Sequence, residues 1–533
     1  MADEAHHDFL SFDEFLTHWA KVSPDQIALE MGERKTTYGE TEVLTRRLIA
    51  LFAENGVRHG DRIAWLGKNS DRYFHLLYAC ARIGVVMAPI GWRLAPPEIT
   101  YILQDTGTKL LFVEEDFVKT ASAVTGAMDN APRVLEVERA FRAAEELEPA
   151  AVTPAGQDDA ILQLYTSGTT GNPKGVGLSN RNMFSLRKPA EDASLPWQKY
   201  VETDCILAAM PCAHIGGTGL AAVATSAGIR AQILPEFTPD GVLHAIQKGA
   251  THMFLVPAAI QFVIQHPLAK ETDFSGLRYL MYGAAPMPLE LLKQTVATMP
   301  GAGLLQVYGM TETCGTVTML PPDDHVLEGN ERMRSAGKAV PGVTIQIRGE
   351  DNKEVGRGEI GEICINSPSN TGGYWKLPEA TAKTIDPDGW LHTGDAGIMD
   401  DDGYVYIQDR IKDMIISGSE NVYPAEVESA IYGHPAVAEV AVIGIPSEQW
   451  GEEVKACCVP KPGMEIEAGD VIATLDPRDF ERQIAQLESQ RDQALAQLAA
   501  LRSGARSEEI AALEAAVTSA QAQVDQARDQ TAR

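Results

Sequence analysis

The stretch "YTSGTTGNPKG", residues 165–175, combines residue types that can bind phosphate groups. Hydroxyl side chains and consecutive glycine amides can surround phosphate oxygens, because neighbouring backbone N–H groups form an anion-binding concavity. Lys174 adds a mobile positive charge. The spacing is not that of a P-loop, since Lys174 is followed by Gly175 instead of Ser or Thr. The stretch predicts a phosphate-binding loop, although a surface turn has a similar composition.

Five further motifs follow this loop in order. They are "PCAHIGGTG" (211–219), "YGAAPMP" (282–288), "QVYGMTET" (306–313), "WLHTGD" (390–395) and "YIQDRIKDMIISGSENVYPAEVE" (406–428). Together with the loop, they resemble the adenylate-forming acyl-CoA synthetase superfamily, and the wording is most similar to its fatty-acyl-CoA synthetase branch. The resemblance covers roughly residues 10–462. It implies that ATP activates a fatty or other small carboxylic acid as an acyl-adenylate, which is then transferred to CoA.

The resemblance also implies an ATP site. Its residues would be Thr166, Ser167, Gly168, Thr169, Thr170, Gly171, Lys174, Gly283, Ala284, Ala285, Pro286, Tyr308, Gly309, Met310, Thr311, Asp395 and Arg410. The loop would hold the β- and γ-phosphates, Thr311 the α-phosphate, and the "GAAP" stretch with Tyr308 the adenine. Asp395 would accept from both ribose hydroxyls, and Arg410 would donate to ribose and phosphate. Glu312 would bind Mg²⁺, which prefers carboxylate and phosphate oxygens. The catalytic residues would be Lys174, His214, Thr311 and Glu312.

The acid and the thiol have separate implied sites. His214 resembles the family's aromatic gate between ATP and the acyl pocket, and Gly216 and Gly217 would leave room for an acyl chain. Residues 211–219 contain no acid that could hold a substrate ammonium group, which disfavours an amino-acid-activating enzyme. Asp409 to Lys412 resembles the hinge of the family, with Lys412 at its end. Ser417, Gly418 and Ser419 would approach the pantetheine arm of CoA.

Simpler explanations stay open for several of these residues. Glu312 could be an exposed carboxylate at a helix start, and alanines such as Ala284 and Ala285 are more often packing residues. An Asp after Thr-Gly, as at Asp395, is common in turns. His214 could be a core histidine whose ring is satisfied by a backbone carbonyl.

The elements that position these motifs can be read from the chain pattern. From about residue 40 to 300, helical segments alternate with short strand-like runs: "TEVLTRRLIALFAENG" precedes "RIAWLG", and "DRYFHLLYACARIG" precedes "VVMAPI". This alternation predicts an α/β protein whose parallel sheets are covered by helices. Short strands with glycine turns over 340–390 predict a small β-rich subdomain. Residues 425–460 predict one helix and two strands. We therefore expect a large N-terminal body over 1–408 and a truncated α+β C-terminal domain over 409–462.

Composition limits the partners. The net charge of −29 argues against nucleic acid or an anionic membrane surface as the main partner. Seven cysteines without metal-ligand spacing indicate reduced thiols in a cytoplasmic protein. Residues 205–229 carry no formal charge, but Pro211, His214 and two glycines favour a buried loop and helix over a membrane span.

Residues 463–533 differ from the rest of the chain. The segment beginning "AGDVIATLDPRDFERQ" resembles the half-lipoyl strand and helical hairpin of HlyD-type membrane-fusion proteins. Apolar or small residues recur at heptad spacing, interrupted by "RSGAR" at 502–506, which predicts an antiparallel coiled-coil hairpin. A single long solvated helix with a kink is the alternative. The hairpin could mediate homo-oligomer formation.

The family resemblance implies a C-terminal lysine that assists adenylation, but residues 462–533 contain none. We therefore expect an acid–CoA ligase whose first half-reaction is impaired. A non-catalytic nucleotide-binding or assembly protein with a coiled-coil tail, and an acyl-AMP ligase that serves a carrier protein, are the alternative functions.

Overall fold

The computed structural model describes residues 8–166, 172–417, 420–432, 434, 436–447 and 450–461, and also 488–489, 491–493, 518–519 and 521–522. The chain divides into two compact units. One comprises residues 1–429 and 442–455, and the other comprises residues 430–441 and 456–533.

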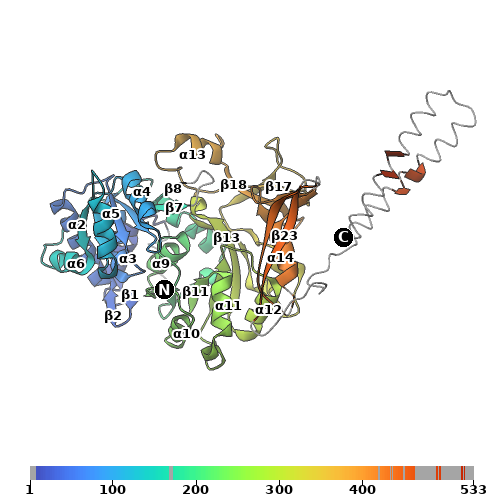
Figure 1. Ribbon diagram of the computed structural model, residues 1–533. Helices are drawn as coiled ribbons and strands as arrows, with labels where there is room; N and C mark the ends of the chain where they lie inside the picture. Colours follow the sequence, from blue (N-terminus) through green and yellow to red (C-terminus); the bar gives the residue numbers. More distant parts are fainter. Residues whose placement is uncertain are drawn as a thin grey trace, which may run out of the picture. The chain divides into compact units, whose positions relative to one another are not determined.

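Six strands form one sheet in the order β6-β5-β3-β4-β7-β8 (Figure 1). They are β3 (Arg62–Leu66), β4 (Val86–Ile90), β5 (Leu110–Val113), β6 (Arg133–Glu136), β7 (Ala160–Thr166) and β8 (Lys174–Ser179). Every paired neighbour is parallel except β7 and β8, which are antiparallel. Because successive side chains of a strand point to opposite faces, Ile63 and Trp65 join the core on one face, and Ala64 and Leu66 join the core on the other.

Helices cover both faces of this sheet. The first core includes buried residues of α2 (Tyr38–Glu54), α3 (Asp71–Ile83) and α6 (Val137–Glu145). The second includes residues of α4 (Pro96–Thr106) and α5 (Val118–Gly126). The predicted helix-covered parallel sheet is therefore present.

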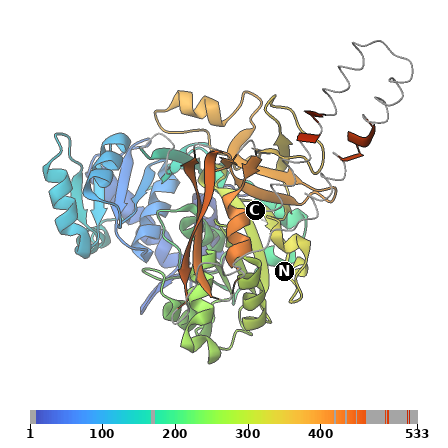
Figure 2. The same cartoon turned by 45° about the vertical axis from the view of Figure 1, so that its right-hand side comes forward.

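A nine-stranded sheet has the order β15-β14-β13-β12-β11-β9-β10-β1-β2. Its strands are β1 (Ile27–Met31), β2 (Arg34–Thr37), β9 (Cys205–Ala208), β10 (Arg230–Ile233), β11 (His252–Leu255), β12 (Tyr279–Gly283), β13 (Gly303–Met310), β14 (Gly315–Leu320) and β15 (Lys338–Ala339). Ile206 packs into the core shared with α1 (Phe12–Val22), α3 and α9 (Ile215–Ala227). Leu207 packs into a separate core with α10 (Pro239–Gln247), α11 (Pro257–Gln265) and α12 (Leu289–Thr298). Figures 1 and 2 show these last three helices grouped together.

Two smaller sheets follow. The first is antiparallel, with β16 (Thr344–Arg348), β17 (Gly361–Asn366), β18 (Leu391–Met399) and β19 (Val405–Arg410). The second contains β20 (Ile415–Ser417), β21 (Glu420–Val422), β22 (Val437–Ser447) and β23 (Gly451–Pro460), with α14 (Pro424–Tyr432) between β21 and β22. The expected β-rich subdomain and the expected helix with two strands are thus present. Short helices α7 (Asn180–Phe184), α8 (Arg187–Asp192) and α13 (Pro378–Thr384) lie in the connections.

Local sequence explains where helices begin and end. The Ser70 hydroxyl accepts from the Arg72 N–H at the start of α3, and Gly84 ends this helix at φ 69°. At the start of α2, Thr37 and Glu40 form a capping box. A left-handed residue after the last turn favours glycine because it has no Cβ. The predicted helices that end near glycine are confirmed.

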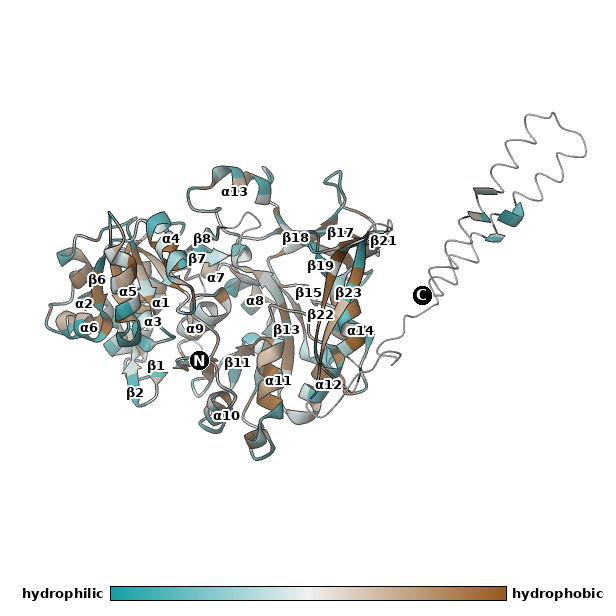
Figure 3. Ribbon diagram, viewed as in Figure 1, coloured by the Kyte–Doolittle hydropathy of each residue, from teal (hydrophilic) through white to brown (hydrophobic). Residues whose placement is uncertain are grey.

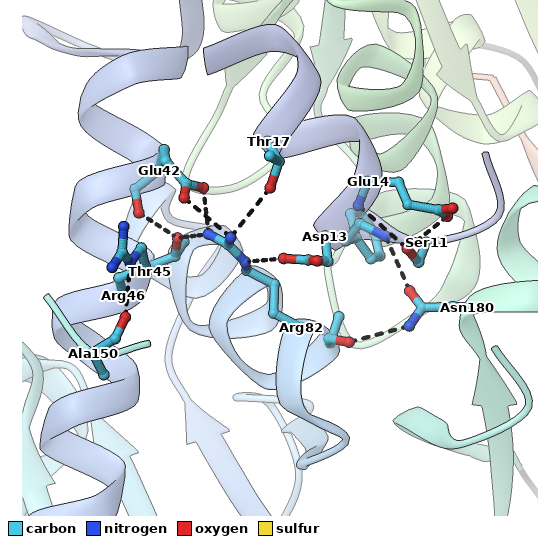
Figure 4. A network of polar contacts seen from close by, with 12 residues as sticks. Ser11, Asp13, Glu14, Thr17, Glu42, Thr45, Arg46, Arg82, Ala150 and Asn180 are labelled. Carbon is cyan, nitrogen blue, oxygen red and sulfur yellow. Dashed lines mark hydrogen bonds and ion pairs between the residues drawn. The ribbon is translucent and has the colours of Figure 1, made fainter. Parts of the chain in front are cut away.

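A buried arginine joins three helices beneath the first sheet. Arg82 on α3 is 2% exposed, and its Nε lies 2.7 Å from Asp13 of α1 while its Nη1 pairs with Glu42 of α2 (Figure 4). Asn180, the first residue of α7, accepts from Phe12 N–H at 3.2 Å and donates to the Ala81 carbonyl at 3.1 Å. Because α7 follows β8 directly, this network anchors the strand that begins at Lys174.

Residues 205–229 form β9, a loop and α9, as predicted. Among the helices of the described ranges we find none with the length and apolar surface that a bilayer crossing needs. All seven cysteines are free. Ile443 of β22 and Val459 of β23 are exposed. Hydrophobic residues recur along both strands (Figure 3).

The tail prediction falls almost wholly outside the described residues. In the few described tail positions, Arg491 donates to the Gln521 side chain at 3.4 Å. The half-lipoyl strand, the coiled-coil hairpin and homo-oligomer formation stay predictions.

Candidate active site

The predicted phosphate loop connects β7 to β8. Thr166 and Lys174 are directly opposite each other in the antiparallel register, so the two ends of the loop are adjacent. Ser167, Gly168, Thr169, Thr170 and Gly171 lie outside the described residues, and their phosphate contacts stay predictions.

Glu312 lies close to this loop although it is far away in sequence. It belongs to a short 3-10 turn, Thr311–Thr313, which follows β13 and ends at Cys314 with φ 57°. Glu312 is 4% exposed, and its Oε1 accepts from the Thr166 hydroxyl at 3.3 Å. The alternative of an exposed helix-start carboxylate is therefore wrong. Thr311 is half-buried beside it.

Tyr374 completes this cluster, and sequence inspection missed it. Its hydroxyl donates to Glu312 Oε1 at 2.9 Å, and Lys174 Nζ lies 4.7 Å from its ring centroid. Burial, together with the nearby Glu312 charge, raises the pKa of Tyr374 well above its ordinary value, so the phenol keeps its proton. Tyr374 lies in none of the six motifs, and no local spacing signals the contact.

The cluster fits a magnesium ion chemically. Oε1 of Glu312 is held by two hydroxyl donors, whereas Oε2 takes part in no hydrogen bond among the residues that the structure describes. A carboxylate oxygen without a partner is the kind of ligand that Mg²⁺ prefers. Lys174 supplies a second positive charge for phosphate oxygens.

The predicted ribose residues come together on neighbouring strands. Asp395 on β18 is opposite Arg410 on β19, with Arg410 Nε 2.6 Å from Asp395 Oδ1. The Tyr308 hydroxyl donates to Asp395 Oδ2 at 2.6 Å. Desolvation raises the pKa of the 5%-exposed Asp395 carboxyl, while the Tyr308 hydrogen bond and the Arg410 charge oppose that shift. A carboxylate held in this way can exchange its present donors for ribose hydroxyls.

A second residue that sequence inspection missed supports the Asp395 turn. Glu362 on β17 accepts from Gly394 N–H through Oε1 at 2.9 Å and lies 2.8 Å from His392 Nδ1 through Oε2. The carboxylate therefore fixes the backbone directly before Asp395. Glu362 lies 30 residues before His392, outside the "WLHTGD" motif.

The predicted adenine stretch follows β12. Gly283 faces Val307 across the strand pair, and a Cβ there would lie 2.0 Å from the Val307 carbonyl oxygen. Ala284 has φ 64°, and Ala284, Ala285 and Pro286 are exposed. Exposed small side chains at a strand end leave a surface free for a flat ring, so a packing role does not explain the two alanines.

Gly309 and Met310 end β13. A Cβ on Gly309 would lie 1.7 Å from the Gly315 carbonyl oxygen of β14, so close strand pairing requires glycine there. Met310 is half-buried. Their contact with ATP stays a prediction.

His214, Gly216 and Gly217 have different surroundings. His214 is exposed at the start of α9, which excludes a core histidine, and partial desolvation lowers its pKa. A Cβ on Gly216 would lie 2.9 Å from the Phe254 ring, so this glycine faces a side chain that can move. A Cβ on Gly217 would lie 2.3 Å from the Pro211 carbonyl oxygen, so tight backbone packing explains this glycine. Their acyl-binding role stays a prediction.

The predicted hinge, Asp409 to Lys412, begins with the last two residues of β19. Asp409 Oδ2 accepts from Ala425 N–H at 3.0 Å, at the start of α14, and Lys412 is exposed. Ser417 ends β20, while Gly418 and Ser419 lie outside the described residues. The hinge and the CoA contacts stay predictions.

Known proteins are similar to this chain in sequence and in structure. A sequence model described as "AMP-binding enzyme" matches residues 16–375, and one described as "AMP-binding enzyme C-terminal domain" matches residues 426–501. The second match extends beyond residue 462, into the segment predicted to be a membrane-fusion-type tail. That segment assignment stays a prediction.

Three relatives illustrate the similarity. A fatty acid–[acyl-carrier-protein] ligase from Streptomyces coeruleorubidus is 38% identical, over 89% of this chain and 92% of that ligase. A long-chain-fatty-acid–CoA ligase from Mycobacterium tuberculosis is 37% identical, over 80% and 83%. The structure of an O-succinylbenzoate coenzyme A synthetase from Bacillus subtilis, in complex with ATP and magnesium ion, superimposes with a TM-score of 0.74 at 30% identity, covering 85% of this chain and 90% of that one.

Proposed function

Because this chain belongs to the family of AMP-binding enzymes, we propose that it is an adenylate-forming ligase that joins a carboxylic acid to a thiol. The carboxylate attacks the α-phosphorus of ATP, the bond to the pyrophosphate oxygen breaks, and acyl-adenylate and pyrophosphate form. A thiol then attacks the acyl carbon and releases AMP. The observation that carries the proposal is the meeting of Thr166, Lys174 and Glu312 at the β7–β8 loop.

The charges of the cluster formed by Thr166, Lys174 and Glu312 suit the formation of acyl-adenylate. Negative charge develops on the leaving pyrophosphate, and Lys174 lies at the end of the loop where it can offset that charge. When bound, Mg²⁺ at Glu312 supplies further positive charge to the phosphate oxygens. Asp395, held by Tyr308 and Arg410, fixes the nucleoside so that the α-phosphorus faces the acid.

We propose a fatty acid as the acid. Two of the relatives described above are named for fatty acids, and residues 211–219 offer no carboxylate for a substrate ammonium group. Relatives of similar identity are named for feruloyl-CoA synthesis and indoleacetate, so the test must include aromatic acids.

The proposed thiol is CoA. A carrier-protein phosphopantetheine is the second candidate, because one relative at 38% identity is named as an acyl-carrier-protein ligase. Both thiols present the same reacting group, and they differ in the surface that must dock.

We also propose that adenylation is slower than thioester formation. Residues 462–533 contain arginine but no lysine. The planar guanidinium replaces the compact ammonium group poorly where a single point charge is needed.

The test measures AMP and pyrophosphate formed from ATP with medium- and long-chain fatty acids, a cinnamic-type acid and an indole acid, each with CoA or a pantetheinylated carrier protein. We expect acid-dependent AMP and pyrophosphate in equal amounts, and a thioester. Formation of ADP, or ATP consumption that does not depend on the acid, would contradict the proposal.

A further inference from the structure

Residues 371–375 form a strap that joins β8 to Glu312. The Thr371 N–H donates to the Glu312 carbonyl at 2.7 Å, and the Thr371 hydroxyl donates to the Gly177 carbonyl of β8 at 2.6 Å. The Trp375 N–H donates to the Gly175 carbonyl at 2.7 Å. The strap therefore runs along β8 immediately after Lys174, before the chain enters α13 (Figure 1).

The backbone of the strap fixes the direction of the Tyr374 side chain. Tyr374 forms an antiparallel bridge with Val176, and its N–H donates to the Thr381 hydroxyl of α13 at 2.9 Å. Tyr374 is thus held from β8 on one side and from α13 on the other. Both supports belong to its main chain, so replacing the side chain leaves them in place.

Two contacts of the Tyr374 side chain can be separated by substitution. Its hydroxyl donates to Glu312 Oε1 at 2.9 Å, and its ring face lies 4.7 Å from Lys174 Nζ. The first contact is a hydrogen bond to a charged acceptor, which is stronger than one between neutral groups. The second is a cation–π contact. One side chain therefore touches both the carboxylate and the ammonium group that face the phosphates.

We propose that Tyr374 is a positioning residue that sets the orientation of Glu312 and the place of Lys174, so that the metal-binding oxygen and the ammonium group face the same phosphates. The inference rests on the proposed function. The only other donor to Oε1 in the described part of the chain is Thr166, at the longer distance of 3.3 Å. Without the phenol, the carboxylate keeps this weaker contact alone and can rotate Oε2 away from the cation.

The Tyr374→Phe variant removes the hydroxyl and keeps the ring. We expect the Mg²⁺ concentration for half-maximal pyrophosphate release to rise about tenfold, on the order of one lost hydrogen bond to a charged acceptor. The KM for the acid should stay unchanged, since no hydrogen bond or ring contact joins Tyr374 to residues 211–219 in the described part of the chain. Tyr374→Leu removes the ring as well, and should raise the KM for ATP about threefold beyond the Phe variant.

Tyr404 provides a matched control. Its hydroxyl also donates to a carboxylate, Asp324 Oδ2 at 2.7 Å, and its ring also faces a lysine, Lys338 at 4.4 Å. Tyr404→Phe therefore removes the same kind of hydrogen bond away from the cluster, and should leave the Mg²⁺ dependence unchanged.

The outcomes separate the two proposals. If the unsubstituted protein releases no pyrophosphate with any acid, the proposed function fails. If it is active and Tyr374→Phe keeps its Mg²⁺ dependence, the positioning role is overturned while the function stands. The role is also overturned if Tyr374→Phe and Tyr404→Phe shift the Mg²⁺ dependence equally, because a general loss of stability then explains the shift. Thermal unfolding of each variant shows whether it is folded.

Discussion

The guanidinium Nε of Arg410 lies 2.6 Å from the carboxylate of Asp395, across the paired strands β18 and β19. Arg410 is the last residue of β19, and Asp409 before it holds the start of α14. The ribose-binding carboxylate is therefore connected, through one ion pair, to the segment that the sequence predicts as the hinge. A movement of Arg410 about the predicted hinge would break this ion pair.

Replacing Asp395 with Asn should weaken ATP binding. The amide keeps the shape but loses the charge that pairs with Arg410 and one acceptor for the ribose hydroxyls. We expect the KM for ATP to rise by at least about tenfold, with the KM for the acid nearly constant. Asp71→Asn is the control, because the buried Asp71 pairs with Arg34 at 2.6 Å and belongs to neither cluster of the site. Equal effects of the two substitutions on ATP would count against the ribose assignment.

His214→Ala tests the acid side of the site. His214 is exposed and makes no side-chain cap to α9, so its loss should leave the free energy of unfolding nearly unchanged. We expect the KM for the acid to rise several-fold, on the order of about 1 kcal/mol of lost contact, while the KM for ATP stays the same. The exposed His244 on α10 serves as the control in His244→Ala. A His214 variant with an unchanged acid KM would remove this residue from the acyl site.

Acid should destabilise the fold through its buried histidines. Burial lowers the pKa of His75 and of His325 from 6.5 to about 4. As the pH falls below 6.5, the unfolded chain takes up protons that the folded chain refuses, so the free energy of unfolding decreases. The loss amounts to about 1.4 kcal/mol per pH unit for each histidine and ends near pH 4. Denaturant unfolding at a series of pH values measures this loss in the unsubstituted protein and in the double variant His75→Gln, His325→Gln. If the free energy of unfolding fell equally steeply with pH in both proteins, the assignment would be refuted.

Preformed acyl-adenylate should react faster than acid and ATP. We propose that the lack of a lysine in residues 462–533 slows the first half-reaction only. Supplying the product of that half-reaction would then bypass the slow step. We expect CoA thioester formation from acyl-adenylate to exceed the full reaction by about tenfold or more, the usual contribution of a positioned charge. Equal rates of thioester formation by the two routes would show that an arginine of residues 462–533 or another group supplies the charge needed for adenylation. No thioester from either route would show that the thioester-forming arrangement is not reached.

Local signals predicted much of the fold. The helix over "DRYFHLLYACARIG" was predicted from its pattern and its final glycine, and α3 does span Asp71–Ile83 and end at Gly84. The parallel sheet followed from the alternation of such helices with short apolar strands. The order of the nine-stranded sheet could not be read, because β10 pairs with β1 across about 200 residues of chain.

Site residues that lie within a sequence motif could be predicted. Thr166, Lys174, Glu312, Asp395 and Arg410 were named from their motifs, and the structure brings them into two clusters. Tyr374 and Glu362 were missed, because each acts through a residue in a distant segment: Tyr374 lies 62 residues from Glu312. Their contacts depend on how the strap and β17 pack, and the spacing of residues along the sequence does not indicate that packing.

Calorimetric titration of the folded chain with ATP, with and without Mg²⁺, tests the central claim most directly. We predict one molecule of ATP bound per chain in the presence of Mg²⁺, much weaker binding when the metal is chelated, and loss of the metal dependence in Glu312→Gln. Lys174→Ala should weaken binding in both conditions, while Lys338→Ala should not. No uptake of ATP with Mg²⁺, or equal uptake by the Glu312→Gln variant, would contradict the account.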